Sequence, residues 1–180
     1  MSETRLKIRL FGEPVLRKKA KAVKEITPDL RQLLSSMSQI MYDCAGIGLA
    51  APQIGIDKSV IVVDAGGGLY KLINPKIVKK EGSYVLEEGC LSIPDVSIKV
   101  KRAKKIKLAA LDEFGKPVSI EAQDLLACVF QHEIDHLKGR LIIDYASFFE
   151  KLRIRKKLEE LKRRRRVEGL PKPETKYFEL

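Results

Sequence analysis

The chain has 180 residues, of which 44% are hydrophobic, and it carries three cysteines and a formal net charge of +11. This length suits one compact domain whose hydrophobic core needs no disulfide bonds. The odd number of cysteines argues against a disulfide-linked secreted scaffold, and no apolar run approaches the ~20 residues that span a bilayer. We therefore expect a cytoplasmic protein.

The first helix is expected to begin at Pro28. Thr27 can cap its N-terminus, Pro28 suits the first turn, and Asp29 favours the positive end of the helix dipole. Apolar residues then recur at helical spacing as far as Cys44. The glycine-containing segment 45–48 ends the helix.

The middle of the chain is rich in short strands. Runs of β-branched and other apolar residues alternate there with glycine, proline and aspartate, a pattern typical of antiparallel hairpins. We expect strands at residues 60–63, 69–73, 76–78, 84–86, 96–100, 106–111 and 118–122, and one more at 141–143.

Two more helices follow. The first is expected from residue 124 to about 138, with Asp124 as its N-cap and Gly139 at its C-terminal end. The second is expected over residues 146–167. The order helix, strands, helix, helix predicts an α+β fold with a mostly antiparallel sheet around a central helix.

The positive charge is concentrated in the last helix. Residues 151–166 hold ten lysines or arginines and two glutamates, a net charge of +8 out of the +11 of the whole chain. A local excess of this kind is typical either of a solvated helix face or of a surface that binds an anionic partner.

The central helix carries His132-Glu133-Ile134-Asp135-His136, an H-E-x-x-H pattern typical of zinc metalloproteases. Residues four apart share a helix face, so His132 and His136 can bind one metal ion together. Glu133 is rotated from His132 by about 100° and can act on a nearby water molecule without being a ligand. The same spacing also occurs by chance on ordinary solvent-exposed helices.

The third metal ligand has to be a cysteine or a carboxylate, because the chain has only two histidines and a catalytic site usually has three protein ligands. Cys128 would lie on the same helix edge as both histidines. Positions 128, 132 and 136 span roughly 12 Å along this edge, too far for all three to bind one ion. Cys44 follows a helix and is interpreted as a core residue. Cys90 stands beside Gly89 in an irregular segment and is the best candidate.

Three segments resemble the signature motifs of the peptide deformylase family, in the family's order and separation. They are Gly46-Ile47-Gly48-Leu49-Ala50-Ala51-Pro52-Gln53, Glu88-Gly89-Cys90-Leu91-Ser92 and Gln131-His132-Glu133-Ile134-Asp135-His136-Leu137. The early stretch from Gly12 to Arg17 looks like the family's N-terminal segment, so the resemblance spans roughly residues 6–150. It points to the bacterial type of the family, which has a C-terminal helix.

The resemblance implies a hydrolase of protein biosynthesis that removes the N-formyl group from the N-terminal methionine of new proteins and releases formate. It implies that Cys90, His132 and His136 bind one divalent metal ion. That ion is natively iron(II) in the family, and zinc, nickel or cobalt can substitute for it. The residue types alone would suit zinc equally well.

The resemblance also assigns catalytic roles. Glu133 is expected to take the proton of the attacking water and return it to the departing amine. The backbone N–H of Leu91 and the side-chain amide of Gln53 are expected to stabilise the oxyanion. Without the resemblance, Gln53 would be interpreted as a loop residue that binds its own backbone. Glu88 and Arg102 match family positions, and we expect them to form a structural ion pair.

A pocket for the methionine side chain is expected beside the metal. Leu125 and Val129 share a helix face with the H-E-x-x-H histidines and are the candidates, with Ile47 and Leu86 opposite them. Gly48 is expected to let the substrate backbone pair with the edge of its strand. Taken without the resemblance, the four apolar residues are ordinary core positions.

Two other functions explain parts of the sequence. A zinc endopeptidase would use Glu159 or Glu160 as its third ligand, but those residues fall in the arginine-rich helix. An RNA- or ribosome-binding module would give the metal a structural role, although structural zinc sites normally have four protein ligands.

We expect three parts along the chain: a catalytic domain of residues 1–145, a basic C-terminal helix of residues 146–167, and a loosely ordered tail of residues 168–180. Because the substrate emerges from the ribosome, we expect the basic helix to bind ribosomal RNA. Formyl-methionyl nascent peptides are the other expected partner, and no membrane is expected to be involved.

Overall fold

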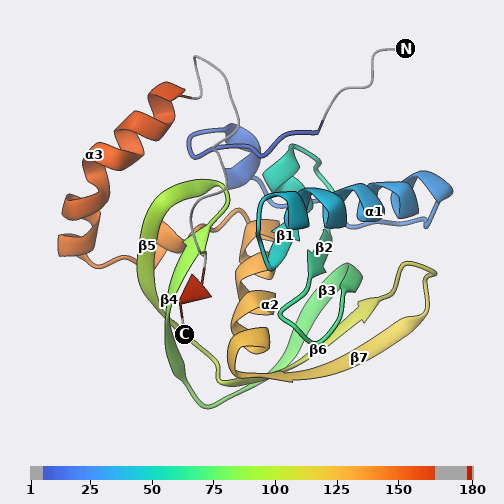
Figure 1. The fold of residues 1–180 in the computed structure, drawn as a ribbon. Helices are drawn as coiled ribbons and strands as arrows, with labels where there is room; N and C mark the ends of the chain where they lie inside the picture. Colours follow the sequence, from blue (N-terminus) through green and yellow to red (C-terminus); the bar gives the residue numbers. More distant parts are fainter. Residues whose placement is uncertain (1–5, 165–177, 180) are drawn as a thin grey trace, which may run out of the picture.

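The computed structural model describes residues 6–164 and 178–179 (Figure 1). The helices are α1 (Pro28–Asp43), α2 (Asp124–Leu137) and α3 (Phe148–Arg164), with short 3-10 helices η1 (Pro14–Arg17), η2 (Ala51–Ile54) and η3 (Ile142–Asp144). The strands are β1 (Gly48–Ala50), β2 (Val60–Val63), β3 (Tyr70–Glu81), β4 (Tyr84–Cys90), β5 (Ile93–Arg102), β6 (Lys105–Leu111), β7 (Pro117–Gln123) and β8 (Phe178–Glu179). Among these residues, none of the helices is long and apolar enough to cross a membrane.

The strands form two antiparallel sheets with α2 between them (Figure 1). One sheet has five strands in the order β1-β2-β3-β6-β7, and the other has three in the order β5-β4-β8. Helix α2 contacts strands of both sheets. The predicted α+β fold, a mostly antiparallel sheet around a central helix with a further helix at the C-terminal side, is confirmed.

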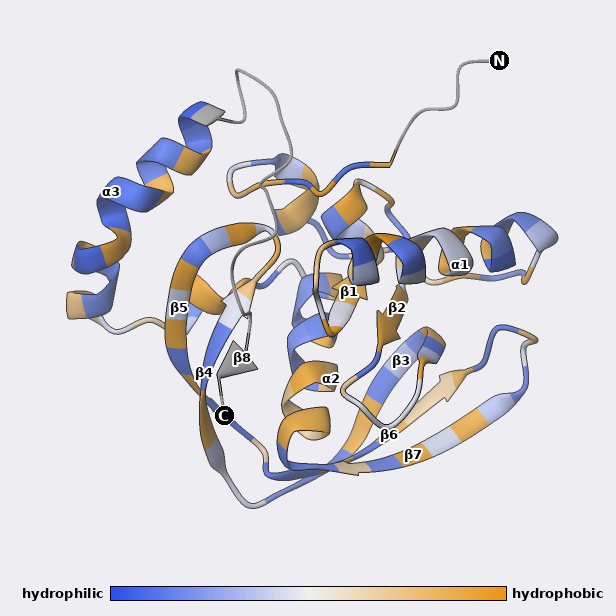
Figure 2. Cartoon of the chain, in the orientation of Figure 1, coloured by the Kyte–Doolittle hydropathy of each residue, from blue (hydrophilic) through white to orange (hydrophobic). Residues whose placement is uncertain are grey.

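Helix α2 is an interior helix. Every side chain from residue 127 to residue 137 is buried. Its apolar residues, including Phe130 and Ile134, pack in the core of the five-stranded sheet. The polar side chains between them are buried as well, although Figure 2 shows α2 with hydrophilic segments at the centre of the molecule. Buried polar groups are costly unless they find partners, so these side chains depend on contacts from other elements.

Helix α3 lies against the three-stranded sheet on one face only. Ile154, Leu158 and Leu161 recur at helical spacing and pack into the cluster that contains Cys90, and Lys157 forms an ion pair with Asp95 at 3.0 Å. Most of the remaining helix is hydrophilic in Figure 2, apart from its start, where Phe148, Phe149 and Leu152 are exposed. This one-sided packing follows from the sequence, because charged residues of either sign occupy the positions between the three apolar residues.

The predicted elements match the structure closely, with two local errors. Thr27 caps α1 as predicted, and its hydroxyl oxygen accepts a hydrogen bond from the N–H of Leu30 at 3.2 Å. Asp124 does not cap α2: Gln123 takes the cap position, while Asp124 has a positive φ of 53°. The predicted strand at 141–143 is also wrong.

The segment at 141–143 is irregular because its three apolar side chains are all buried in one cluster, whereas a half-buried strand alternates between two faces. The segment instead enters η3, where the carboxylate of Asp144 accepts a hydrogen bond from the N–H of Leu141 at 2.9 Å. The predicted end of the third helix at 167 lies outside the described residues. So does most of the predicted tail, of which residues 178 and 179 pair with Glu88 and Glu87 of β4.

Candidate metal centre

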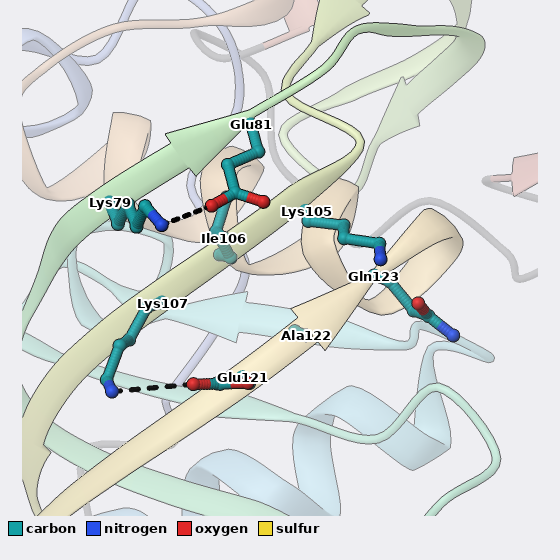
Figure 3. Close-up of a pocket in the computed structure, with 8 residues that line it drawn as sticks. All are labelled: Lys79, Glu81, Lys105, Ile106, Lys107, Glu121, Ala122 and Gln123. Atoms are coloured by element: carbon teal, nitrogen blue, oxygen red, sulfur yellow. Dashed lines mark ion pairs between the residues drawn. The ribbon is translucent and has the colours of Figure 1, made fainter.

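Two surface hollows lie away from the sequence motifs. One of them is formed by β3, β6 and β7 and is lined mainly by charged side chains (Figure 3). Lys79 pairs with Glu81 there, and Lys107 pairs with Glu121 at 3.4 Å. The residues that line this hollow include no histidine or cysteine, so the chemistry that the motifs indicate has to be located elsewhere.

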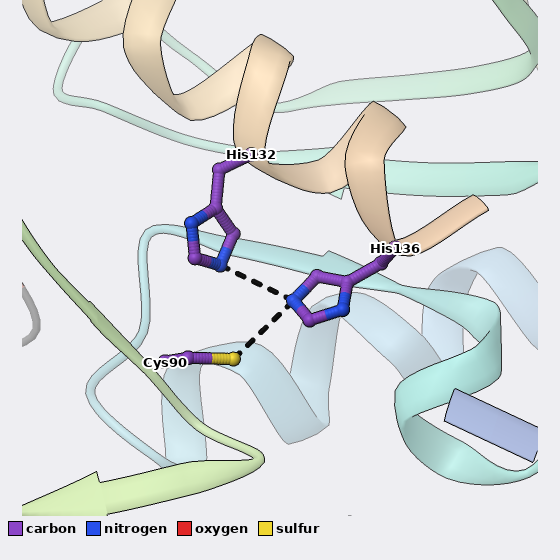
Figure 4. Close-up of side chains that lie close together, drawn as sticks. All are labelled: Cys90, His132 and His136. Carbon is purple, nitrogen blue, oxygen red and sulfur yellow. Dashed lines mark hydrogen bonds between the residues drawn. The ribbon is translucent and has the colours of Figure 1, made fainter. Parts of the chain in front are cut away.

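Cys90, His132 and His136 converge in the interior, as Figure 4 shows. Nε2 of His132 lies 3.2 Å from Nε2 of His136, and the latter atom lies 3.3 Å from Sγ of Cys90. In a tetrahedral site with metal–nitrogen bonds near 2.0–2.1 Å and a metal–sulfur bond near 2.3 Å, these separations would be roughly 3.3 and 3.6 Å. The three donor atoms therefore fit one metal ion in a site with an open fourth position.

The three candidate ligands come from two elements that the fold holds together. The histidines lie one turn apart on α2, while Cys90 ends β4. The pairing of β4 with β5 shifts register between Glu88 and Cys90. Such an irregularity changes the direction of a strand and of its side chains, and here it accompanies the turn of Cys90 toward the helix.

The surroundings shift the pKa values of the two histidines in opposite directions. Burial, together with the charge on His132, lowers the pKa of His136 well below its usual value, which keeps this imidazole neutral. Burial also disfavours the charged form of His132, but hydrogen bonds to Cys90 and Glu88 outweigh it and raise the pKa of His132. Nδ1 of His132 lies 2.9 Å from Oε2 of Glu88. A proton on Nδ1 donated to this carboxylate leaves Nε2 as the ligand atom.

The predicted ion pair between Glu88 and Arg102 is confirmed, and it is buried. Nε and Nη2 of Arg102 donate to the two oxygens of Glu88 at 2.7 and 2.9 Å. The hydrogen bonds from Arg102 and His132 outweigh burial and lower the pKa of Glu88. The contact of Glu88 with His132 was not predicted from the sequence. Strand alternation puts Glu88 on the same face of β4 as Cys90, and that was the one available signal.

Glu133 lies beside the ligands and is itself buried. Burial raises the pKa of its carboxyl group to about 7, and Oε2 has no hydrogen-bond partner among the described residues. The backbone of Gly48 in β1 packs against it so closely that a Cβ added at Gly48 would lie 2.4 Å from Oε1 of Glu133. A buried carboxyl group with a free oxygen and a pKa near neutrality suits a group that exchanges protons.

Gln53 combines both interpretations of its sequence position. Its Oε1 accepts a hydrogen bond from the N–H of Ala50 at 2.8 Å, so the side chain does bind its own loop. Its Nε2 points into the site and donates to Sγ of Cys90 at 3.6 Å. Leu91 is buried directly after Cys90, which brings its backbone to the same place.

The structure brings together three of the four apolar pocket candidates. Val129 is buried in the core of the five-stranded sheet, and Ile47 and Leu125 pack against that cluster as partly buried residues. Leu86 is buried on β4. Their partial exposure distinguishes Ile47 and Leu125 from ordinary core residues.

Comparisons with known proteins give one consistent result. The sequence model of the polypeptide deformylase family matches residues 5–152. A peptide deformylase of Halothermothrix orenii is 52% identical over 141 residues, which cover 77% of this chain and 92% of that protein. The crystal structure of a peptide deformylase from Legionella pneumophila has a TM-score of 0.83 and 40% identity, covering 91% of this chain and 98% of that one. The peptide deformylase of Synechococcus elongatus in complex with actinonin has a TM-score of 0.78 and 41% identity, covering 89% and 86%.

Proposed function

Because the chain belongs to the peptide deformylase family, we propose that it removes the N-formyl group from the N-terminal methionine of newly synthesised proteins and releases formate. The observation that carries this proposal is the buried set of Cys90, His132 and His136 with the carboxyl group of Glu133 beside it. The zinc endopeptidase alternative would need Glu159 or Glu160 as a ligand. Both residues are exposed on α3, on an element remote from α2 in Figure 1.

We assign the metal site to Cys90, His132 and His136. Iron(II) is the expected native ion, and zinc, nickel or cobalt are expected to substitute for it. When bound, the divalent ion acts as a Lewis acid on the formyl oxygen and lowers the pKa of a water molecule. A thiolate with two neutral imidazoles is a ligand set that suits such ions.

The protein residues then handle protons and charge. Glu133 takes the proton of the attacking water and delivers it to the amine nitrogen as the carbon–nitrogen bond breaks. The side-chain amide of Gln53 and the backbone N–H of Leu91 donate hydrogen bonds to the oxyanion that forms on the formyl carbon. Because Oε1 of Gln53 is held by Ala50, its amide group is fixed in orientation before the substrate arrives.

The substrate lies along β1 in this proposal. Gly48 offers its backbone to the peptide, and Ile47, Leu86, Leu125 and Val129 surround the methionine side chain. The half-buried positions of Ile47 and Leu125 support this placement, because a pocket needs apolar side chains that reach both the core and the solvent.

The test measures formate release from a formyl-methionyl tripeptide by protein loaded with iron(II) under nitrogen. The same tripeptide with an acetyl group in place of the formyl group is the matched control, and a longer formyl peptide reports cleavage of internal bonds. We expect formate release that a chelator abolishes and that added metal restores. Actinonin, which is bound in the Synechococcus elongatus structure, should suppress it. Internal cleavage without formate release would favour the endopeptidase alternative.

We further propose that α3 binds the enzyme to ribosomal RNA in the cytoplasm. Lys151, Arg153, Arg155 and Lys156 are exposed on this helix, whereas Lys157 is half-buried against Asp95. Two aromatic side chains at its start, Phe148 and Phe149, are 72% and 80% exposed. A basic helix with exposed aromatic residues suits an anionic surface with stacked bases.

The ribosome test keeps the packing of α3 and changes only its exposed charge. One variant replaces Lys151, Arg153 and Lys156 by serine, and the control variant replaces Lys76, Lys80 and Lys116, which are equally exposed on β3 and a hairpin turn. We expect the α3 variant alone to lose affinity for ribosomes in co-sedimentation. The slope of its log affinity against log salt concentration should fall by the amount that roughly three phosphate contacts contribute. Turnover of a short formyl peptide should stay near normal in both. Equal ribosome binding by the two variants would contradict the proposal.

A further inference from the structure

We propose that Tyr145, at the junction between η3 and α3, is a positioning residue for the metal ligand His132. It acts through Asp135, Arg102 and Glu88. This inference rests on the metal site assigned above, and it extends that site to a half-exposed side chain at the base of α3. Among the described residues, the hydroxyl of Tyr145 forms hydrogen bonds with Arg102 and Asp135 and with none of the three candidate ligands.

A continuous set of hydrogen bonds leads from His132 to Tyr145. Glu88 binds Nδ1 of His132 and receives the two parallel hydrogen bonds of Arg102. The remaining terminal nitrogen of Arg102, Nη1, donates to Oδ2 of Asp135 at 2.5 Å. The hydroxyl of Tyr145 donates to the same oxygen at 2.6 Å.

This network of hydrogen bonds is buried except at its outer end. Glu88, Arg102 and Asp135 are buried, whereas Tyr145 is 38% exposed. The guanidinium carbon of Arg102 lies 4.9 Å from the centre of the Tyr145 ring, so the ring covers the cation as well as binding its partner. Tyr145 therefore fixes Arg102 in two ways. Its ring lies against the guanidinium group, and its hydroxyl binds Asp135, the carboxylate to which Arg102 also donates.

The role of the hydroxyl follows from charge. Arg102 carries one positive charge and serves two buried carboxylates, those of Glu88 and Asp135. Tyr145 supplies Asp135 with a second hydrogen-bond donor, so Asp135 does not depend on Arg102 alone. Without this hydroxyl, Arg102 has to satisfy Asp135 alone, and the geometry of its two bonds to Glu88 is expected to shift. Glu88 sets the orientation of the His132 ring, so the ligand atom shifts with it.

The position of Tyr145 is fixed by the elements on either side. It follows η3 directly, and its N–H donates to the carbonyl of Ile142 at 3.0 Å. Two residues later Ser147 begins α3 with a reciprocal cap: its N–H donates to the Glu150 carboxylate at 2.8 Å, and its hydroxyl accepts from the N–H of Glu150 at 3.3 Å. The hydroxyl of Tyr145 is thus held at Asp135 by backbone on both sides.

The test compares Tyr145→Phe with Tyr42→Phe. Tyr42 is a matched control because its hydroxyl also donates to a carboxylate, that of Asp64 at 2.7 Å, and not to the network of Asp135, Arg102 and Glu88. Both proteins are loaded with cobalt(II), whose visible absorption reports ligand geometry, and metal affinity is measured by competition with a chelator. Partners in direct contact with a ligand typically contribute about 10–100-fold to metal affinity or activity. For Tyr145→Phe, further out, we expect about a five- to tenfold loss of cobalt affinity and kcat, a changed spectrum and an unchanged KM.

A second variant tests the route of the effect. Asp135→Asn should lose more than Tyr145→Phe, and the double variant should lose no more than Asp135→Asn alone, since residues in one network are not additive. Additive losses, or a Tyr145→Phe protein with the affinity and spectrum of Tyr42→Phe, would overturn the inference. Spectrum and affinity are measured without substrate. A wild-type protein that binds cobalt but releases no formate would therefore count against the proposed function. The inference about Tyr145 would still be decided by cobalt affinity and the visible spectrum.

Discussion

Replacing Gly48 by alanine is the sharpest single test of how the site is assembled. The new Cβ would lie 2.4 Å from Oε1 of Glu133 and 2.9 Å from its Cδ. Since carbon and oxygen atoms in contact stay about 3.4 Å apart or more, the carboxylate has to move by roughly 1 Å. The change tests whether Gly48 is glycine because Glu133 occupies the space of its side chain.

The expected cost falls mainly on turnover. A misplacement of about 1 Å in a reacting group can lower the rate by about 10²-fold, so we expect kcat to fall by that factor while KM changes little. Overpacking costs about 1–3 kcal/mol, and the loss of glycine freedom in the unfolded chain returns about 0.4–1 kcal/mol. The net loss is at most about 2.6 kcal/mol, which corresponds to a fall in Tm of up to roughly 10 °C for a chain of this size.

The assay combines steady-state formate release with thermal unfolding. Gly67→Ala is the matched control, because a Cβ there would meet nothing within 4 Å. In a Glu133→Ala background the side chain that obstructs the new Cβ is gone, so Gly48→Ala should no longer lower Tm there. A rise in KM with normal kcat would refute this reasoning and show that Gly48 serves only the substrate backbone. An equal loss of stability in both backgrounds would refute it as well.

The remaining predictions concern the metal and Glu133. Cys90→Ser should lose most bound metal under anaerobic purification, whereas Cys44→Ser and Cys128→Ser should retain it, as metal analysis of all three would check. Glu133→Ala should keep the metal content of the wild type and lose about 10²–10⁴-fold in kcat; turnover within a few fold of wild type would move the proton-transfer role to another residue. Air should inactivate iron-loaded protein and spare nickel-loaded protein, so equal half-lives in air would exclude iron(II) or its thiolate ligand as the vulnerable centre. Burial raises the pKa of Glu133 to about 7. The folded protein, after its metal is removed with a chelator, therefore holds the proton of this carboxyl group more tightly than the unfolded chain does. The stabilisation is full below about pH 4.3 and is lost as the pH rises to about 7. Urea titrations should show that loss in the wild type and a flatter profile in Glu133→Gln.

The sequence was most informative where the determinants are local. The cap at Thr27 and the shared face of His132 and His136 depend on residues within one or two helical turns, and the structure has both. Cys90 was predicted by counting the histidines and by excluding Cys128 and Cys44, and its Sγ lies 3.3 Å from Nε2 of His136 in the structure. The contact of Glu88 with His132 joins residues 44 positions apart, and no local pattern fixes such a distance.

The errors have the same physical origin. The apolar run at 141–143 has the composition of a strand, but its side chains all enter one cluster, and only tertiary packing decides between these outcomes. Asp124 has a residue type favoured at helix N-caps, yet the chain leaves β7 in a direction that gives the cap position to Gln123. The hydrogen bond from Tyr145 to Asp135 also depends on tertiary packing, because it joins the end of η3 to α2.

The origin of the ligands in two different layers has a consequence for folding. Cys90 belongs to the three-stranded sheet, whereas the histidines belong to the helix that packs on the five-stranded sheet. An ion held by all three therefore cross-links the two halves of the molecule, and its binding free energy becomes part of the free energy of folding. At a free metal concentration one hundred times the Kd this linkage amounts to about 2.7 kcal/mol. The melting temperature of the protein is then itself a measure of metal affinity, and a series of divalent ions can be ranked by heat alone.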